Sequence, residues 1–260
     1  MIDLHAHILP GLDDGPQNMD EALALARATV EAGVHTVLAT PHVSRRYPNG
    51  PELVDAAVRD LNATLASQEI ALTVRRGAEI ALSMLADLDD DDLAGLRLGD
   101  GDFVLLESPL NAVTGDVGPL VLRVQQRGFR VLLAHPERSP GFQHDRDALH
   151  RLAASGVLMS VTAGAFAGSF GKIPRRLAAW MLREGLVHNV CSDMHDLRGR
   201  PPGMAAPVTA SGDLRPLLEP QLRWLCDAMP RAVLDGTPLP PLPRVPGVGE
   251  RARPRWRRLF

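Results

Sequence analysis

Histidine and acidic side chains recur at one kind of position in this 260-residue sequence, at or just after a short apolar run. The residues of this set are His5, His7, His42, Glu79, Glu107, His135, Asp193 and His195. Imidazoles and carboxylates without cysteine suit zinc, manganese or iron. Within each of the pairs His5-x-His7 and Asp193-x-His195, both side chains lie on one side of an extended segment, because side chains alternate with period two. These residue types and spacings predict a metal centre.

The apolar runs that must position these residues are typical of β-strands. Seven are predicted, at residues 2–5, 36–40, 72–77, 103–107, 130–134, 158–161 and 187–191. Amphipathic patterns typical of helices alternate with them, at residues 19–32, 53–67, 84–93, 120–127, 145–154, 174–184 and 214–228. This alternation predicts an α/β fold of parallel strands with right-handed crossovers, either a barrel or an open doubly wound sheet.

Two features favour the barrel. No glycine-rich dinucleotide fingerprint follows the first strand, which weakens the open-sheet interpretation. In a β/α barrel the carboxyl end of every strand faces the same mouth, so the candidate ligands would converge there. Six of the seven predicted strands end in such a side chain, whereas the sixth ends in Thr162-Ala163-Gly164.

Composition narrows the function classes. Hydrophobic residues make up 45% and charged residues 23%, as in ordinary globular proteins. The formal charge of −3 gives no basic excess for a dedicated nucleic-acid binder. No apolar run approaches the roughly 20 residues of a transmembrane segment, and the N-terminus lacks a signal-peptide pattern, so we expect a cytoplasmic protein. A barrel domain is predicted over residues 1–236, followed by a Pro-rich and Arg-rich tail over residues 237–260.

The first predicted loop after a strand, Asp13-Asp14-Gly15-Pro16, offers one more carboxylate. It is either a simple turn, which Asp-Gly favours, or the source of a further ligand, Asp14. With Asp14 the candidates number nine, which is too many for one ion and enough for three. The net charge of such a site would be about +3, counted from three divalent ions, four carboxylates, a hydroxide and two nearby arginines. This charge suits a phosphate monoester dianion.

Together these motifs resemble the polymerase and histidinol phosphatase (PHP) superfamily. The resemblance covers roughly residues 1–236 and rests on His5-x-His7, the loop from Leu9 to Pro16, Thr40-Pro41-His42, Gly77-x-Glu79, His135-Pro136-Glu137-Arg138 and Ser192-Asp193-x-His195. The first loop and the segment from Asp193 to Pro202 are most similar to the superfamily's bacterial tyrosine-protein phosphatases from capsular and exopolysaccharide gene clusters. The resemblance implies a distorted (β/α)7 TIM-like barrel and a phosphoric monoester hydrolase that acts on phosphotyrosine.

The resemblance also implies a trinuclear site that usually holds manganese, with zinc or iron as alternatives. One ion would be held by His5, His7, Glu79 and Asp193, a second by Glu79, Glu107 and His135, and a third by Asp14, His42 and His195. Arg138 and Arg200 are similar to phosphate-binding arginines, with Arg198 as the alternative to Arg200; the guanidinium fork meets phosphate oxygens in pairs. The implied mechanism is attack of a metal-bridging hydroxide on phosphorus, without a general acid that the sequence identifies.

Other predictions rest on fewer residues. The loop after His42 is either an ordinary surface loop or a substrate-binding lid, in which Arg45 and Arg46 would attract acidic phosphopeptides and Tyr47 would stack on the phenyl ring. The partner would be a phosphotyrosine protein such as a membrane-associated bacterial tyrosine kinase, and the oligomeric state stays open. The alternatives are a small-molecule phosphatase such as histidinol phosphatase, and a non-catalytic metal-binding scaffold. Neither Cys191 nor Cys226 has an arginine six residues later, which argues against a thiol-based phosphatase.

Overall fold

The computed structural model describes residues 1–110 and 117–249, so the arginines predicted to form the end of the tail, at residues 251–258, lie outside the described residues. Within these ranges the strands form two parallel sheets. The first has the order β1-β2-β4, with bounds Ile2–Ala6, Thr36–Ala39 and Thr73–Arg76. The second has the order β3-β5-β6-β7-β8-β9, with bounds His42–Val43, Glu79–Ala81, Phe103–Glu107, Arg130–Ala134, Leu158–Thr162 and Asn189–Cys191.

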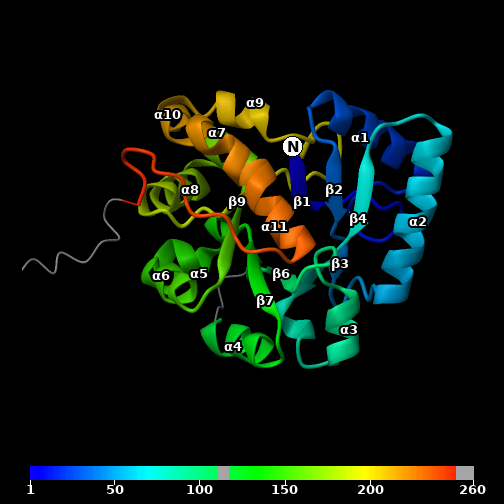
Figure 1. The fold of residues 1–260 in the computed structure, drawn as a ribbon, viewed down its shortest axis with the longest axis horizontal. Coiled ribbons are helices and arrows are strands. Elements are labelled where there is room, and N and C mark those ends of the chain that lie inside the picture. Colours follow the sequence, from blue (N-terminus) through cyan, green and yellow to red (C-terminus); the bar gives the residue numbers. More distant parts are fainter. Residues whose placement is uncertain (111–116, 250–260) are drawn as a thin grey trace, which may run out of the picture.

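The two sheets continue into one another. Strand β2 stops before Pro41, which has no N–H for the ladder, and the chain resumes as β3; β4 likewise resumes as β5 after Gly77. Across this break the Glu79 N–H donates to the Pro41 carbonyl over 3.0 Å. Seven composite strands result, and β1 meets the segment that follows β9 through a bridge between Ala6 and Met194. The predicted distorted (β/α)7 barrel is confirmed, and its closing seam runs between β1 and β9 (Figure 1).

Helices surround the strands (Figure 1). The longer ones are α1 Met19–Glu31, α2 Pro51–Ser67, α4 Gly118–Gln126, α6 Asp147–Ala154 and α8 Lys172–Glu184. The shorter ones are α3 Asp90–Gly95, α5 Pro140–His144, α7 Ala163–Ala167, α9 Ala205–Thr209, α10 Arg215–Leu218 and α11 Met229–Asp235. Helix α1 begins where the Asn18 side chain accepts from the Glu21 N–H over 3.0 Å, and it buries Ala22, Leu25 and Ala26.

Two predicted helices are wrong in their bounds. In place of a helix at residues 84–93, Leu82–Met84 is a 3-10 turn and α3 begins only at Asp90. A capping box between Asp89 and Asp92 fixes that start, so the acidic run lies at a helix N-terminus, where carboxylates are favoured. In place of one helix at residues 214–228, short α, 3-10 and π segments alternate around two prolines.

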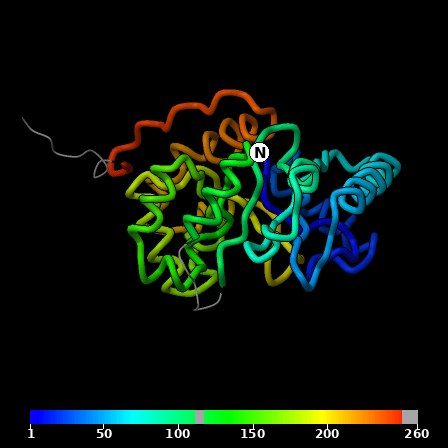
Figure 2. Tube along the Cα trace, turned by 90° about the horizontal axis from the view of Figure 1, so that it is seen from below, coloured from blue at the N-terminus to red at the C-terminus, as the bar shows by residue number. Residues whose placement is uncertain are grey.

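The Pro-rich residues 237–249 run back along the outside of the barrel, drawn in orange and red in Figure 2. The Trp224 Nε1 donates to the Pro240 carbonyl over 3.4 Å, and the Gly249 N–H donates to the Arg183 carbonyl over 2.8 Å. The domain boundary after residue 236 stays a prediction. Among the described residues, no helix is both long and apolar enough to cross a membrane.

Candidate metal centre

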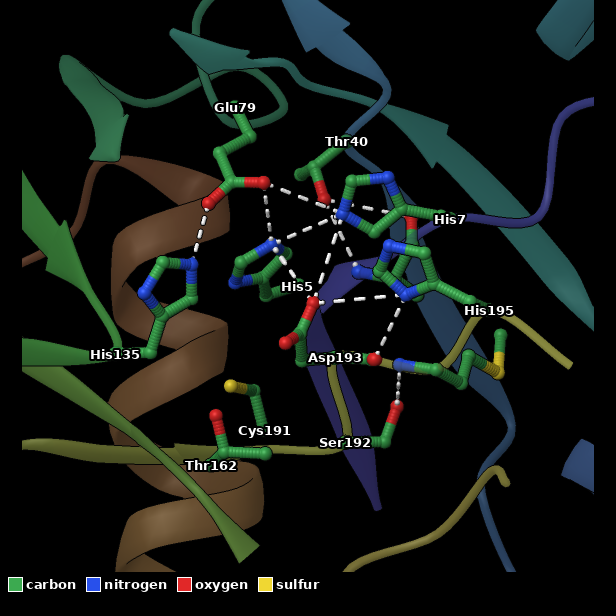
Figure 3. A network of polar contacts seen from close by, with 12 residues as sticks. His5, His7, Thr40, Glu79, His135, Thr162, Cys191, Ser192, Asp193 and His195 are labelled. Carbon is green, nitrogen blue, oxygen red and sulfur yellow. Dashed lines mark hydrogen bonds and ion pairs between the residues drawn. The ribbon is translucent and has the colours of Figure 1, made fainter. Parts of the chain in front are cut away.

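Six of the seven composite strands carry the predicted ligands in or just after their last segment, which brings these side chains together at one mouth of the barrel. Strand β1 carries His5 and is followed by His7, β3 and β5 begin with His42 and Glu79, β6 ends with Glu107, His135 follows β7, and Asp193 and His195 follow β9. Parallel strands end on the same side, which makes neighbours of residues far apart in the sequence. Figure 3 shows the side chains of His5, His7, Glu79, His135, Asp193 and His195 gathered around one another.

Glu79 is the common neighbour in this set. Its Oε2 lies 3.2 Å from His5 Nε2 and 3.3 Å from His7 Nε2. The same oxygen lies 3.1 Å from His42 Nδ1, whereas Oε1 lies 2.7 Å from His135 Nε2. The carboxylate is buried, and its two oxygens contact different histidines of the set; its role as a ligand that bridges two ions stays a prediction.

Asp193 divides its two oxygens between two kinds of partner. Its Oδ1 lies 3.4 Å from His5 Nε2 and 3.6 Å from His7 Nε2. Its Oδ2 accepts from Arg138 Nη1 over 2.5 Å and from Arg200 Nη1 over 3.3 Å. One carboxylate thus connects the histidine pair to both arginines that were predicted to bind phosphate.

Asp14 lies on the open side of the site. Its Oδ1 lies 3.4 Å from His42 Nε2 and 3.3 Å from His195 Nε2, and its Oδ2 accepts from Arg200 Nη2 over 3.3 Å. The Asp14 side chain is 44% exposed, whereas His195 is buried. The structure therefore places Arg200, and not the exposed Arg198, against the carboxylates of the site.

The donor set fits divalent cations. Four groups have donor atoms that all lie within 4.8 Å of one another: His7, Asp14, His42 and His195; His5, His7 and Asp193; His5, Glu79 and His135; and His42, Glu79 and Glu107. Among the described residues, Glu79 Oε2, Asp193 Oδ1 and His195 Nε2 are buried without a hydrogen-bond partner, which is costly unless an ion satisfies them. Oxygen and imidazole donors without a thiolate fit manganese, zinc or iron.

The pKa values of His5 and His7 are raised, which also indicates that the site favours positive charge. Burial lowers the pKa of His5, but the carboxylates of Glu79 and Asp193 outweigh burial and raise this pKa to about 9. Burial also lowers the pKa of His7, but the Asp13 and Glu79 carboxylates beside its ring outweigh burial and raise this pKa to about 9. Despite their own burial, Glu79 and Asp193 have lowered pKa values because these imidazoles lie beside them. These shifts show that the carboxylates of the site favour positive charge at the histidines, which bound metal cations would also supply.

Two residues of the site have left-handed backbone conformations. His135 has φ of 34° and Asp193 has φ of 52°, which is uncommon for residues other than glycine. The His135 N–H donates to the Ser160 carbonyl over 2.8 Å, and the Asp193 N–H donates to the His5 carbonyl over 3.0 Å. Neighbouring strands thus hold both strained turns, as is common at functional sites.

Asp13 is a site residue that the sequence interpretation missed. Its Oδ2 lies 2.6 Å from His7 Nδ1 and accepts from the His42 N–H over 3.1 Å, and its Oδ1 accepts from the Gly15 N–H over 2.9 Å. A carboxylate on Nδ1 fixes the tautomer in which His7 Nε2 is free to bind a metal. The sequence signal that could have identified Asp13 is the pair Asp13-Asp14, since the second ring nitrogen of a histidine ligand usually donates to a carboxylate.

Phe170 is a second residue that was missed. It follows α7, which comes after β8, the one composite strand without a predicted ligand. The guanidinium of Arg138 lies over its ring at 4.7 Å from the centroid, within the range of a cation–π contact. No sequence pattern connects the two residues, because an isolated phenylalanine is usually part of a core.

The loop after β3 meets the site through one residue. The Tyr47 ring stacks on the His42 ring, with centroids 5.9 Å apart and planes 13° apart, and the Arg46 guanidinium lies 5.0 Å from the Tyr47 centroid. Arg45 is 78% exposed and pairs with Asp87 at 3.5 Å. Tyr47 therefore lies against the site, and Arg45 lies on the surface beside it.

Neither cysteine has the environment of a nucleophile. Burial raises the pKa of Cys191 well above its ordinary value, and it also raises the pKa of Cys226. The Sγ of Cys191 lies 3.8 Å from the Val161 carbonyl, and Figure 3 shows it outside the network of site contacts. Both thiols stay protonated, which excludes attack by a cysteine thiolate.

Comparisons with known proteins agree with this geometry. Residues 1–211 match a family described as "Capsular polysaccharide synthesis, CpsB/CapC". The chain is 34% identical over 201 residues to the tyrosine-protein phosphatase YwqE of Bacillus subtilis, which covers 77% of this chain and 79% of the relative. It is 30% identical over 204 residues to the putative tyrosine-protein phosphatase CapC of Staphylococcus aureus, with coverage of 77% and 79%.

Solved structures give the same relationship. The chain superposes with a TM-score of 0.79 and 29% identity on a structure from work on YwqE of Bacillus subtilis and CpsB of Streptococcus pneumoniae, described as unique metal-dependent tyrosine phosphatases. The match covers 92% of this chain and 96% of the other. A lactonase from Listeria monocytogenes, 12% identical with a TM-score of 0.50, is similar in fold alone.

Proposed function

The chain belongs to the CpsB/CapC family of capsular polysaccharide synthesis, and on this premise we propose that it is a metal-dependent protein-tyrosine phosphatase. One observation carries the proposal: nine imidazole and carboxylate side chains that could bind metal ions lie together with two arginines at a single barrel mouth. The names of the relatives support phosphotyrosine as the substrate class. The buried, protonated thiols leave metal ions as the source of the nucleophile.

Three divalent ions, with manganese as the first choice, would complete the site. The first would be held by His5, His7, Glu79 and Asp193, the second by Glu79, Glu107 and His135, and the third by Asp14, His42 and His195. The short distances within these sets support this assignment. When bound, such ions lower the pKa of a water molecule toward neutrality and neutralise phosphate oxygens.

The chain's own contribution is to orient the phosphate. Arg138 and Arg200 both reach Asp193 Oδ2, so the two guanidinium groups lie beside the same carboxylate oxygen. A guanidinium fork offers paired N–H donors to phosphate oxygens, which fixes the direction of the ester bond. Phe170 restrains Arg138 from behind, so less rotamer entropy is lost when phosphate binds.

The leaving group is the phenolate of a tyrosine side chain. Positive charge beside the departing oxygen stabilises it, and Arg200 spans from Asp193 to the open side at Asp14, where that oxygen would emerge. Tyr47, stacked on His42, stays our prediction for contact with the phenyl ring, and Arg45 for contact with acidic flanking residues.

We propose a bacterial tyrosine kinase of a capsular or exopolysaccharide system as the physiological substrate, with dephosphorylation taking place in the cytoplasm. The family description supports the connection with capsule synthesis. A kinase of this kind is membrane-associated, so the phosphatase would meet it at the inner surface of the membrane.

The test is phosphate release from a phosphotyrosine peptide by the manganese-loaded protein, with histidinol phosphate in parallel and a chelator control. We expect turnover of the phosphotyrosine peptide alone, abolished by the chelator. Turnover of histidinol phosphate alone would make the protein a small-molecule phosphatase. Release from neither substrate by a fully metal-loaded protein would refute the catalytic proposal.

A further inference from the structure

A cavity of about 430 Å³ opens directly beside the metal centre. One wall is the first loop with the start of α1, and the other is the loop that follows β9. Its lining includes Asp14 and His195, so it is continuous with the outermost group of ligands. Pockets of roughly 300–1,000 Å³ are typical of ligand sites, and apart from Asp14 and His195 none of the lining residues was assigned to the ions or the phosphate above.

The lining combines apolar and acidic surface. Pro16, Leu25 and Leu197 contribute apolar atoms, and Leu197 is 51% exposed. Glu21 and Asp196 contribute carboxylates from opposite walls.

These two carboxylates retain free acceptor capacity. Each oxygen of Glu21 accepts one hydrogen bond, from the Gln17 N–H over 2.8 Å and from the Asn18 amide over 3.0 Å. Asp196 receives the N–H groups of Arg198 and Gly199 on Oδ1 alone, over 2.6 and 2.5 Å. Since a carboxylate has about four acceptor sites, both groups can accept further hydrogen bonds from a ligand.

The charge of the cavity is opposite to that of the phosphate-binding region. Asp14, Glu21 and Asp196 outnumber Arg198, the one lysine or arginine among the described residues that line the cavity. Arg138 lies instead at Asp193, and Arg200 pairs with both Asp193 and Asp14, so the acidic character of the cavity rests on Glu21 and Asp196. A ligand that suits both regions therefore carries an anion at one end and a cation a few ångströms away.

We propose that this cavity binds the side chain of a residue flanking the phosphotyrosine and that it selects lysine or arginine. Such side chains have an apolar stem that fits the wall formed by Pro16, Leu25 and Leu197, and a cationic head that meets Glu21 and Asp196. This inference deepens the proposed tyrosine-phosphatase function and rests on it. On this proposal, α1 and the loop that follows β9 determine which residues are preferred beside the phosphotyrosine.

The experiment measures kcat/KM of the manganese-loaded protein on a series of phosphotyrosine peptides, with free phosphotyrosine as the reference. Lysine, alanine or glutamate stands in turn at each of the two positions on either side of the phosphotyrosine. At one position we expect lysine to exceed alanine by about two- to five-fold at low salt and glutamate to fall below alanine, as for a partly exposed ion pair.

Three variants connect this ratio to the cavity. Glu21→Gln removes the charge and keeps one acceptor oxygen for one of the two hydrogen bonds at the start of α1, and it should bring the lysine-to-alanine ratio close to one. Glu21→Lys should invert the order of lysine and glutamate. Asp20→Asn removes an exposed charge one residue away that does not line the cavity, and it should preserve the ratio.

The outcomes separate the inference from the function on which it rests. Hydrolysis of all peptides without a preference for lysine, or an order that Glu21→Lys leaves unchanged, would overturn the subsite. The subsite would also be overturned if Asp20→Asn lowered the lysine-to-alanine ratio as much as Glu21→Gln does, because the effect would then come from the overall negative charge of α1. If neither the peptides nor free phosphotyrosine were hydrolysed, the proposed function would be refuted, and the subsite with it.

Discussion

Replacement of Asp13 by asparagine should weaken metal binding although Asp13 touches no proposed ion. The Asp13 carboxylate accepts three hydrogen bonds, from His7 Nδ1 and from the N–H groups of Gly15 and His42. An amide of the same size has one oxygen and can keep only part of this set. If its NH2 group faces His7, the imidazole takes the tautomer with a proton on Nε2, the atom that faces Glu79.

The expected size follows from these contacts. Removal of the carboxylate behind a histidine ligand typically costs about 10- to 100-fold in metal affinity, or about 1.4–2.8 kcal/mol. Asp13 is nearly buried and also holds the His42 backbone, so we expect Asp13→Asn in the upper part of that range. Asp13→Ala should be at least as severe, because it leaves three buried donors without an acceptor.

The assay is calorimetric titration of the metal-free protein with manganese, beside a thermal melt of the metal-free form. Asp20→Asn is the control, because Asp20 is an exposed aspartate in the same part of the chain. A folded Asp13→Asn protein that binds manganese as tightly as the parent would refute the proposed role of the carboxylate. A variant whose melting temperature falls together with its affinity would show a role in folding, so the metal-free melt must stay near that of the parent.

Three further predictions concern protons, arginine and thiol. Neighbouring carboxylates outweigh burial and raise the pKa values of His5 and His7 to about 9, whereas their Nε2 atoms lie only 3.2 Å apart and cannot both carry a proton toward the other. Manganese binding should therefore release at least one proton and tighten as pH rises toward 9; titrations in buffers of different ionisation enthalpy measure this release. Arg138→Lys should lower kcat/KM on phosphotyrosine at least tenfold, and Phe170→Leu by about two- to five-fold, mainly through KM in steady-state assays. Cys191→Ala should keep most of the activity, and loss of turnover in a folded, metal-loaded variant would contradict the metal-based mechanism.

The strand ends could be predicted from the sequence because each ligand immediately adjoins its own apolar run. His42 and Glu79 illustrate this: each lies just beyond a break in a composite strand, at Pro41 and at Gly77, and the breaks move them only slightly from the predicted positions. Local patterns of this kind survive folding because the barrel imposes one direction on every strand.

Contacts between loops could not be predicted in the same way. Asp13 and Asp14 are adjacent, and the sequence does not say which one faces inward; the turn decides it, because Gly15 packs against His7 so closely that a Cβ there would lie 2.9 Å from the His7 carbonyl oxygen. The pairing of Phe170 with Arg138 joins two separate loops. Helical periodicity also misled at residues 84–93, where the cap at Asp89 outweighed the apolar pattern.

The closing seam of the barrel and the centre of the site are the same piece of structure. Asp3 on β1 accepts from the Ser192 N–H over 3.1 Å, and the next residue, Asp193, donates its N–H to the His5 carbonyl. These bonds hold Asp193 in its left-handed conformation, with one oxygen toward the histidines and the other toward the arginines. The Asp193 carboxylate contacts both the histidine pair and the two arginines. A small slip of β9 against β1 would therefore separate the histidine pair from the phosphate-binding arginines. Precision at the metal centre therefore depends on the hydrogen bonds that close the barrel.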